Sequence, residues 1–263
     1  MTYTTRLLQG LGRVYLGLLL LFLYLPLFIM ALMSFNASTF YQLPFDWTVK
    51  WYAALAGNDR LIEATWNSLR IALMTTAIAT VLGTAAALAL FRHDFRGKRI
   101  LQILLFPPIA IPWLISGTAM LIFFFGTGIG RGVHAILLGH VALALPYVVI
   151  VVSARLETFE IELEEAARSL GASQWQVTRL VTLPSIMPGV IAGGLFAFAV
   201  SFDQFVVSYF LSTPGEATLP VEIYAAIRKG FTPEINAVSS IIIFFSMGLM
   251  LAVARFFSFA GGR

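Results

Sequence analysis

The chain has 263 residues, of which 59% are hydrophobic and 11% charged, and its mean hydropathy is +0.87. A soluble domain of this size could not cover its surface with polar groups, so a soluble domain is excluded. The net charge is +4, but the basic residues lie in short loops rather than on one soluble face, which argues against a nucleic-acid partner. Without Cys there are no disulfides and no thiolate metal sites.

About 20 apolar residues span a bilayer as a helix, and uncharged runs of that length recur along the chain. The first covers residues 14–33, behind Arg6 and Arg13. Because a signal-peptide core has only about 7 to 15 residues, this run predicts an uncleaved first span. Residues 34–66 are polar, turn-rich and Trp-containing, which predicts an outer loop with a short surface helix. Residues 67–91 form the second predicted span.

Residues 92–99, RHDFRGKR, hold four of the seventeen Lys and Arg residues. The positive-inside rule places this loop in the cytoplasm. Its role is interpreted as topogenic, because the GxxxxGK[ST] frame of a phosphate-binding loop is missing here and elsewhere. The chain is therefore not expected to bind ATP.

Residues 100–125 form the third predicted span, which is interrupted and bent by Pro107, Pro108 and Pro112. A glycine-rich outer turn over residues 126–132 follows, and the fourth span covers residues 133–154. His134 and His140 lie in that span, six positions apart. They fall on roughly opposite faces of a helix, so they are expected to be packing or interface residues rather than a metal-binding pair.

Residues 157–188, here called the island, are rich in charged residues within an otherwise apolar sequence. The first half of the island predicts a short amphipathic helix over residues 157–170. One face carries Phe159, Leu163, Ala166 and Leu170, and another carries Glu157, Glu160, Glu164 and Arg168. Glu164 and Arg168 are spaced to pair at i, i+4. Gly171 predicts a left-handed helix end.

A second short helix is expected from Ser173 to about residue 180, because Ser173 and Gln176 have the spacing of a capping box. Pro184 and Pro188 are expected to lie beyond its end. The two short helices would together form a compact knob on the inner side.

The fifth predicted span covers residues 189–211 and contains Asp203 in its outer third. A charge at membrane depth costs roughly 2.5 to 3.5 kcal/mol unless it faces water or a partner. One hypothesis is that Asp203 lines a solute path and attracts a cationic amine, with Gln204 and Ser208 beside it. The alternative is that Asp203 is hydrated near the interface or pairs with another membrane subunit. An outer loop over residues 212–233 and a last span over residues 235–254 complete the chain.

With both termini inside, eleven of the seventeen basic residues fall in the predicted cytoplasmic segments, which supports that orientation. They are Arg6, Arg13, Arg92, Arg96, Lys98, Arg99, Arg155, Arg168, Arg179, Arg255 and Arg263.

The spacing of several residues in the island resembles the EAA loop of bacterial ABC importer permeases. They are Glu165-Ala166-Ala167, Gly171, Val181 and Leu183-Pro184. The resemblance implies a cytoplasmic loop whose first helix docks on an ATPase subunit. The implied coupling residues are Glu165, Ala166, Ala167, Gly171, Leu183 and Pro184.

The subgroup that the chain most resembles is that of spermidine and putrescine permeases. The similar stretches are Phe95-Arg96-Gly97-Lys98, Ser201-Phe202-Asp203, Thr218-Leu219-Pro220 and Pro233-Glu234-Ile235-Asn236-Ala237. Polyamine permeases often carry two adjacent acids where this chain has Asp203-Gln204. Importers for 4-aminobutyrate, aminophosphonates or ferric iron share much of the pattern, so these solutes are the alternatives to a polyamine.

The sequence therefore predicts an all-α, six-span permease subunit, a single transmembrane domain over residues 1–263, in the bacterial inner membrane. The resemblance implies two ATP-binding subunits, a second and different permease chain, and an extracytoplasmic solute-binding protein as partners. No enzyme activity and no cofactor are expected, since HExxH and an aspartyl dyad are both missing. A channel or passive scaffold is the rival function, but it would not need the EAA-like knob.

Overall fold

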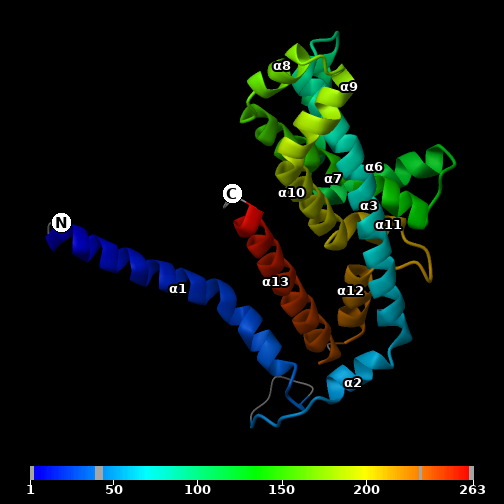
Figure 1. Cartoon of the computed structure of the whole chain (residues 1–263). Coiled ribbons are helices and arrows are strands. Elements are labelled where there is room, and N and C mark those ends of the chain that lie inside the picture. The colour runs from blue at the N-terminus through cyan, green and yellow to red at the C-terminus, as the bar shows by residue number, and fades with distance from the viewer. Residues whose placement is uncertain (1–2, 39–43, 231–232, 261–263) are drawn as a thin grey trace. The chain divides into compact units, whose positions relative to one another are not determined.

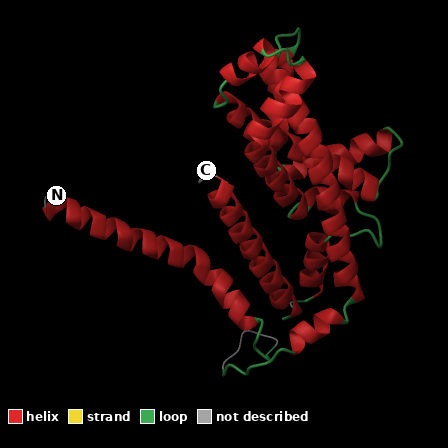
Figure 2. Cartoon of the chain, in the orientation of Figure 1, coloured by secondary structure: helices red, strands yellow, loops and turns green. Residues whose placement is uncertain are grey.

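The computed structural model describes residues 3–38, 44–230 and 233–260, and every regular element in these ranges is a helix (Figure 2). The all-α prediction is confirmed. By their contacts the helices fall into two units, one made of residues 1–62 with 223–263 and the other of residues 63–222. Arg263, counted above among the inner charges, lies outside the described residues.

The first unit contains α1 (Tyr3–Met33), α2 (Lys50–Ala56) and α13 (Glu234–Ala260). α13 contacts both α1 and α2 (Figure 1). The indole of Trp51 in α2 donates to the Asn36 carbonyl at 2.8 Å, and the hydroxyls of Ser34 and Tyr52 lie 2.7 Å apart. α2 is thus the short helix expected after the first span. α1 begins upstream of the predicted residue 14.

Four helical stretches among the described residues are long and apolar enough to cross a membrane. They are Gly10–Met33, Asp59–Arg92, Val133–Glu157 and Gln174–Phe202. A bent pair, Lys98–Ala110 with Trp113–Gly126, makes a fifth if it is one span. α13 contributes the shorter apolar segment Glu234–Gly248. A polytopic protein is therefore clear, and the count of six spans stays a prediction.

The helix α3 (Asp59–Arg92) begins earlier than the predicted residue 67. The side-chain oxygen of Asn58 accepts a hydrogen bond from the Leu61 amide at 3.2 Å, so Asn58 caps the helix start. Part of the predicted outer loop is consequently helical.

The proline-rich third segment is interrupted at its prolines, as predicted. α4 (Lys98–Leu104), α5 (Pro107–Ala110) and α6 (Trp113–Gly126) follow one another, with a bend of 111° before Trp113. Ile111 is extended, with φ −77° and ψ 133°, as expected for a residue that precedes proline. The interruption and bend predicted at these prolines are confirmed, and the assignment of residues 100–125 to one span stays a prediction.

The second unit is centred on α7 (Val133–Glu157), which packs most extensively against α10 (Leu183–Phe202). Their backbones approach closely, since a Cβ on Gly189 would lie 2.7 Å from the Cβ of Arg155. The hydrophobic effect does not drive helices together in lipid. Small residues at such crossings let the helices approach closely, so that van der Waals packing stabilises the pair. The core contains Ala79, Ala87, Leu90, Ala144, Val148, Val149, Val152, Leu156, Ile186 and Ala197.

The fifth span is not the continuous helix predicted over residues 189–211. α10 starts at Leu183 and ends at Phe202, and α11 (Val206–Leu211) follows after a break at residues 203–205. The predicted outer loop over residues 212–233 also contains a helix, α12 (Leu219–Lys229), with Pro220 in its first turn. Proline is tolerated there because the first amides of a helix have no intrahelical acceptor.

Candidate functional site

The first helix of the charged island, α8 (Glu162–Ser169), is shorter than the predicted 157–170. α7 continues to Glu157, and the Thr158 hydroxyl donates to the Arg155 carbonyl at 3.0 Å, which satisfies an acceptor at the end of α7. Phe159 lies in the following turn, so it does not share a helical face with Leu163.

The C-terminal end of α8 is a Schellman motif. Gly171 has φ +88°, its amide donates to the Arg168 carbonyl at 2.9 Å, and the Ala172 amide donates to the Ala167 carbonyl at 3.1 Å. Both bonds are those that define the motif. The left-handed end predicted at Gly171 is confirmed.

The second helix, α9 (Gln174–Val177), begins with the predicted capping box. The Ser173 amide donates to the Gln176 side chain at 2.8 Å, and the Gln176 amide donates to the Ser173 hydroxyl at 3.4 Å. A π-helical turn, η1 (Thr178–Thr182), then leads directly into α10. α9 ends before Pro184 as predicted, but the chain stays helical beyond residue 180, because η1 joins α9 to α10 and Pro184 lies in the first turn of α10.

Glu164 is the centre of a buried polar network that joins α3, α8 and η1. Its carboxylate accepts hydrogen bonds from both terminal nitrogens of Arg92 and from the Thr182 hydroxyl. Arg168 adds the predicted i, i+4 ion pair, with its guanidinium 3.3 Å from the carboxylate. The Arg92 guanidinium also lies over the ring of Phe159, 5.4 Å from its centroid. The network ties α8 to the end of α3.

The charge state of Glu164 follows from these contacts. Burial by itself would raise the pKa of the carboxyl group. Hydrogen bonds from Arg92 and Thr182, together with the charges of Arg92 and Arg168, outweigh burial and hold the pKa of Glu164 below its ordinary value. The carboxylate is therefore ionised at neutral pH, although only 1% of its side chain is exposed.

The outer surface of α8 and α9 carries exposed apolar side chains beside charged ones such as Glu162 and Glu165. The exposed fractions of Leu163, Leu170 and Trp175 are 47%, 90% and 69%. α8 thus buries part of its polar face and exposes its apolar one, which is the reverse of an ordinary surface helix. Figure 1 shows α8 and α9 together at one end of α3, α7 and α10.

The residues singled out by the EAA resemblance have different surroundings. Glu165, Ala166, Gly171 and Pro184 are exposed, Ala167 is half-buried, and Leu183 packs against the core. Arg92, Glu164 and Thr182 were not identified as site residues. Only the i, i+4 spacing of Glu164 and Arg168 signalled part of the network, and nothing in the sequence links Arg92 to it.

The break between α10 and α11 contains two of the three residues proposed for the solute path. The side chain of Asp203 is exposed, whereas Gln204 is 1% and Ser208 0% exposed. Gln204 is not helical, so the i, i+4 relation expected between it and Ser208 does not apply. Its side-chain oxygen instead accepts from the Val206 amide at 3.2 Å.

His140 reaches this break from the middle of α7. Its Nδ1 lies 2.9 Å from the Ser201 hydroxyl and its Nε2 lies 3.0 Å from the Ser208 hydroxyl. His140 is buried, as expected for a packing residue, but both of its ring nitrogens also form hydrogen bonds. His134 is exposed, and its Nε2 lies 2.9 Å from the Ile129 carbonyl.

The start of the predicted second span lies against one of the stretches that resemble polyamine permeases. The Asn67 side chain donates to the carbonyls of Gly215 and Ala217, at 3.4 and 3.3 Å. The Ser68 hydroxyl accepts from the Leu219 amide at 2.8 Å. The Asn67-Ser68 pair thus fixes the approach to the Thr218-Leu219-Pro220 stretch.

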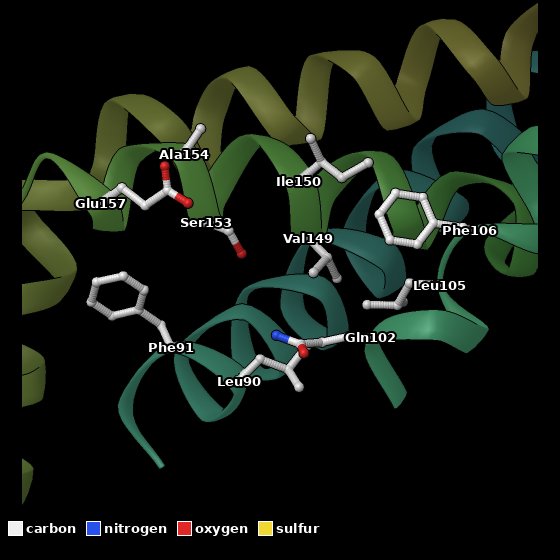
Figure 3. Close-up of a pocket in the computed structure, with 10 residues that line it drawn as sticks. All are labelled: Leu90, Phe91, Gln102, Leu105, Phe106, Val149, Ile150, Ser153, Ala154 and Glu157. Carbon is white, nitrogen blue, oxygen red and sulfur yellow. The ribbon is translucent and has the colours of Figure 1, made fainter. Parts of the chain in front are cut away.

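A pocket of about 490 Å³ lies between the ends of α3, α4 and α7. Leu105, Phe106 and Ile150 lie at one end of it and Glu157 at the other (Figure 3). Its lining is mainly apolar and contains none of the residues proposed for the solute path. No group of three or more His, Asp or Glu side chains that could hold a metal ion occurs among the described residues.

Comparison with known proteins places these features in a family. Residues 79–260 match the family described as "Binding-protein-dependent transport system inner membrane component". The spermidine/putrescine transport system permease protein PotC of Escherichia coli strain K12 is 37% identical over 231 residues, 88% of each chain. The putrescine transport system permease protein PotI of the same strain is 37% identical over 229 residues, 84% of this chain and 82% of PotI.

A bacterial ABC transporter that imports the acidic polysaccharide alginate has a similar structure. Its TM-score is 0.77 at 18% identity, and the match covers 98% of this chain and 99% of the other. At that identity the structural similarity shows the fold alone, and membership of a family is shown by the family match and the sequence relatives. The chain belongs to the family of inner membrane components of binding-protein-dependent transport systems.

Proposed function

We propose that this permease subunit carries a polyamine, such as spermidine or putrescine, through the inner membrane in an ATP-driven importer. The solute class is supported by the 37% identity to PotC and PotI over most of the chain. The observation that carries the coupling role is α8, whose apolar side chains are exposed while Glu164 anchors the helix from beneath. This chain performs no chemistry, and its ATPase partners hydrolyse ATP.

The partners follow from that assignment. Two ATP-binding subunits serve the importer, and one of them docks on the apolar surface of α8 and α9. A second permease, a different chain, completes the membrane part, and an extracytoplasmic protein delivers the solute. In α8, Glu165 is the polar anchor for the ATPase, and Ala166 and Ala167 allow close approach.

The orientation places both termini, the basic loop 92–99 and the island 157–188 in the cytoplasm. The charge bias of the loops supports this direction. The Arg92–Glu164 contact supports a common side for the loop and the island, because it joins them directly. The ATPase surface then lies where ATP is found.

The coupling role is tested by Glu165→Lys in the co-expressed importer. Reversing an exposed charge in the docking helix should weaken capture of the ATPase subunits about tenfold, or roughly 1.4 kcal/mol, through like-charge repulsion. Capture on affinity-tagged permease is measured after detergent extraction. Glu63→Lys, the same reversal at an exposed position of α3, is the control. Equal capture in both variants would remove Glu165 from the interface.

The path role is tested by Asp203→Asn, which keeps the size of the side chain and deletes its charge. Uptake of labelled putrescine should fall at least tenfold, because the cation loses its carboxylate partner. Assembly and the affinity of the binding protein should not change. Asp94→Asn removes an exposed acid whose surface pair with Lys98 contributes little, and it serves as control. Normal uptake by assembled Asp203→Asn importer would exclude Asp203 as a solute contact.

A further inference from the structure

We infer that His140 is a positioning residue that fixes the break between α10 and α11 and thereby holds Asp203 in place for the solute. This inference rests on the proposed path role of Asp203. It concerns a residue outside the EAA-like loop, on a helix that carries none of the proposed path residues.

The contacts of His140 join both sides of the break. Ser201 belongs to the last turn of α10 and Ser208 to α11, while His140 comes from α7. Neutral imidazole has one N–H donor and one acceptor nitrogen, so one serine hydroxyl accepts from the ring and the other donates to it. At 1% exposure for His140 and 0% for Ser208, no solvent competes for these bonds. The three side chains therefore form one closed bridge.

Packing around the bridge leaves α11 little freedom to move. A Cβ on Gly139 would lie 2.8 Å from Val207 Cγ1 and 3.4 Å from Leu211 Cδ1, so the backbone of α7 lies directly against α11. Within the break, Gln204 turns inward and its oxygen accepts from the Val206 amide. Asp203 is the break residue whose side chain is left exposed.

Packing alone does not explain why the three side chains of the bridge are polar. An apolar side chain on α7, opposite two alanines, would fill the same space without buried polar groups to satisfy. Irregular backbone at membrane depth is tolerated where it is buried in protein or lines a wet cavity. Hydrogen bonds from a third helix to both sides of the break give it one defined geometry, and they hold the Asp203 carboxylate at a fixed site.

The discriminating variant is the triple substitution His140→Leu with Ser201→Ala and Ser208→Ala. It removes all three polar groups together, so none is left buried and unpaired. The complete importer, in proteoliposomes with its binding protein, is supplied with radiolabelled putrescine and ATP. We expect the triple variant to assemble, to hydrolyse ATP within twofold of wild type, and to transport at least fivefold fewer putrescine molecules per ATP.

His140→Gln is the conservative variant, because an amide also supplies a donor nitrogen and an acceptor oxygen. It should keep the ratio of transport to hydrolysis within twofold of wild type. A merely structural role would lower uptake and hydrolysis together and leave their ratio unchanged. If the triple variant does not assemble, His140→Asn, which is too short to reach both serines, is measured in the same way and should show the fivefold loss.

Asp203→Asn in the same assay separates the two proposals. An unchanged ratio in the assembled triple variant, with transport lost in Asp203→Asn, would overturn the role of His140 alone. Normal transport by Asp203→Asn would overturn the path role and the positioning role together.

Discussion

Glu164→Ala should release α8 from the permease and abolish stable capture of the ATPase subunits. The substitution leaves the partly buried Arg92 guanidinium and the buried Thr182 hydroxyl without their shared acceptor. Removing one partner of a buried ion pair costs about 3 to 5 kcal/mol, because the remaining charge is uncompensated. A helix of this length has little stability of its own, so it should detach once the network is lost.

Hydrogen exchange of the α8 amides measures this release directly. A loss of about 3 kcal/mol corresponds to exchange roughly 100-fold faster, provided that opening is local. Glu162→Ala removes an exposed acid from the same helix and should leave exchange nearly unchanged. The double variant Arg92→Met with Glu164→Met should restore part of the protection, because apolar residues often replace a buried pair without loss. Equal exchange in Glu164→Ala and Glu162→Ala would show that the network does not hold α8.

Local sequence signals predicted two helix ends of the island, the C-terminal end of α8 and the start of α9. Gly171 and the Ser173–Gln176 capping box depend only on neighbouring backbone groups, and both have the predicted geometry. The three prolines of the third segment likewise predicted a distortion there, although its size of 111° depends on packing. Such features can be predicted from sequence because the groups that cause them lie within one or two helical turns of each other.

The polar networks could not be predicted in this way, because they join distant parts of the chain. Glu164 meets Arg92 across 72 positions, and His140 meets Ser201 across 61. The periodicity of α8 correctly separated polar from apolar positions. It did not say which side would be buried, because an apolar face usually packs inward, whereas here Leu163 and Leu170 are exposed and Glu164 is buried.

The break at residues 203–205 shows the same limit. No proline or glycine occurs there, so the apolar run predicted one continuous helix. The bonds that stabilise the break come from His140 in α7 and from the buried Gln204 side chain. Tertiary contacts outweigh helix propensity at this point, and this is also where the proposed solute contact lies.

Gly171→Val should misdirect α8 although no side chain would clash with it. No atom lies within 4 Å of a Cβ built at this position, so the penalty comes from the backbone alone. With φ at +88°, a β-branched residue is strained by about 1 to 3 kcal/mol. Relief of the strain would break the two bonds that end the helix and turn α8 away from its docking direction. At 2 kcal/mol, capture of the ATPase subunits should weaken about 30-fold.

Gly171→Asn separates strain from bulk, because Asn visits the left-handed region at lower cost than Val. Capture and transport per ATP should therefore rank Gly first, Asn second and Val last. Gly126→Val is the matched control, since that glycine is helical and also has no atom within 4 Å of a Cβ. It should retain normal capture. If Gly171→Asn and Gly171→Val lost capture equally, the ATPase would contact residue 171 itself, and positive φ would not be the reason that glycine is needed there.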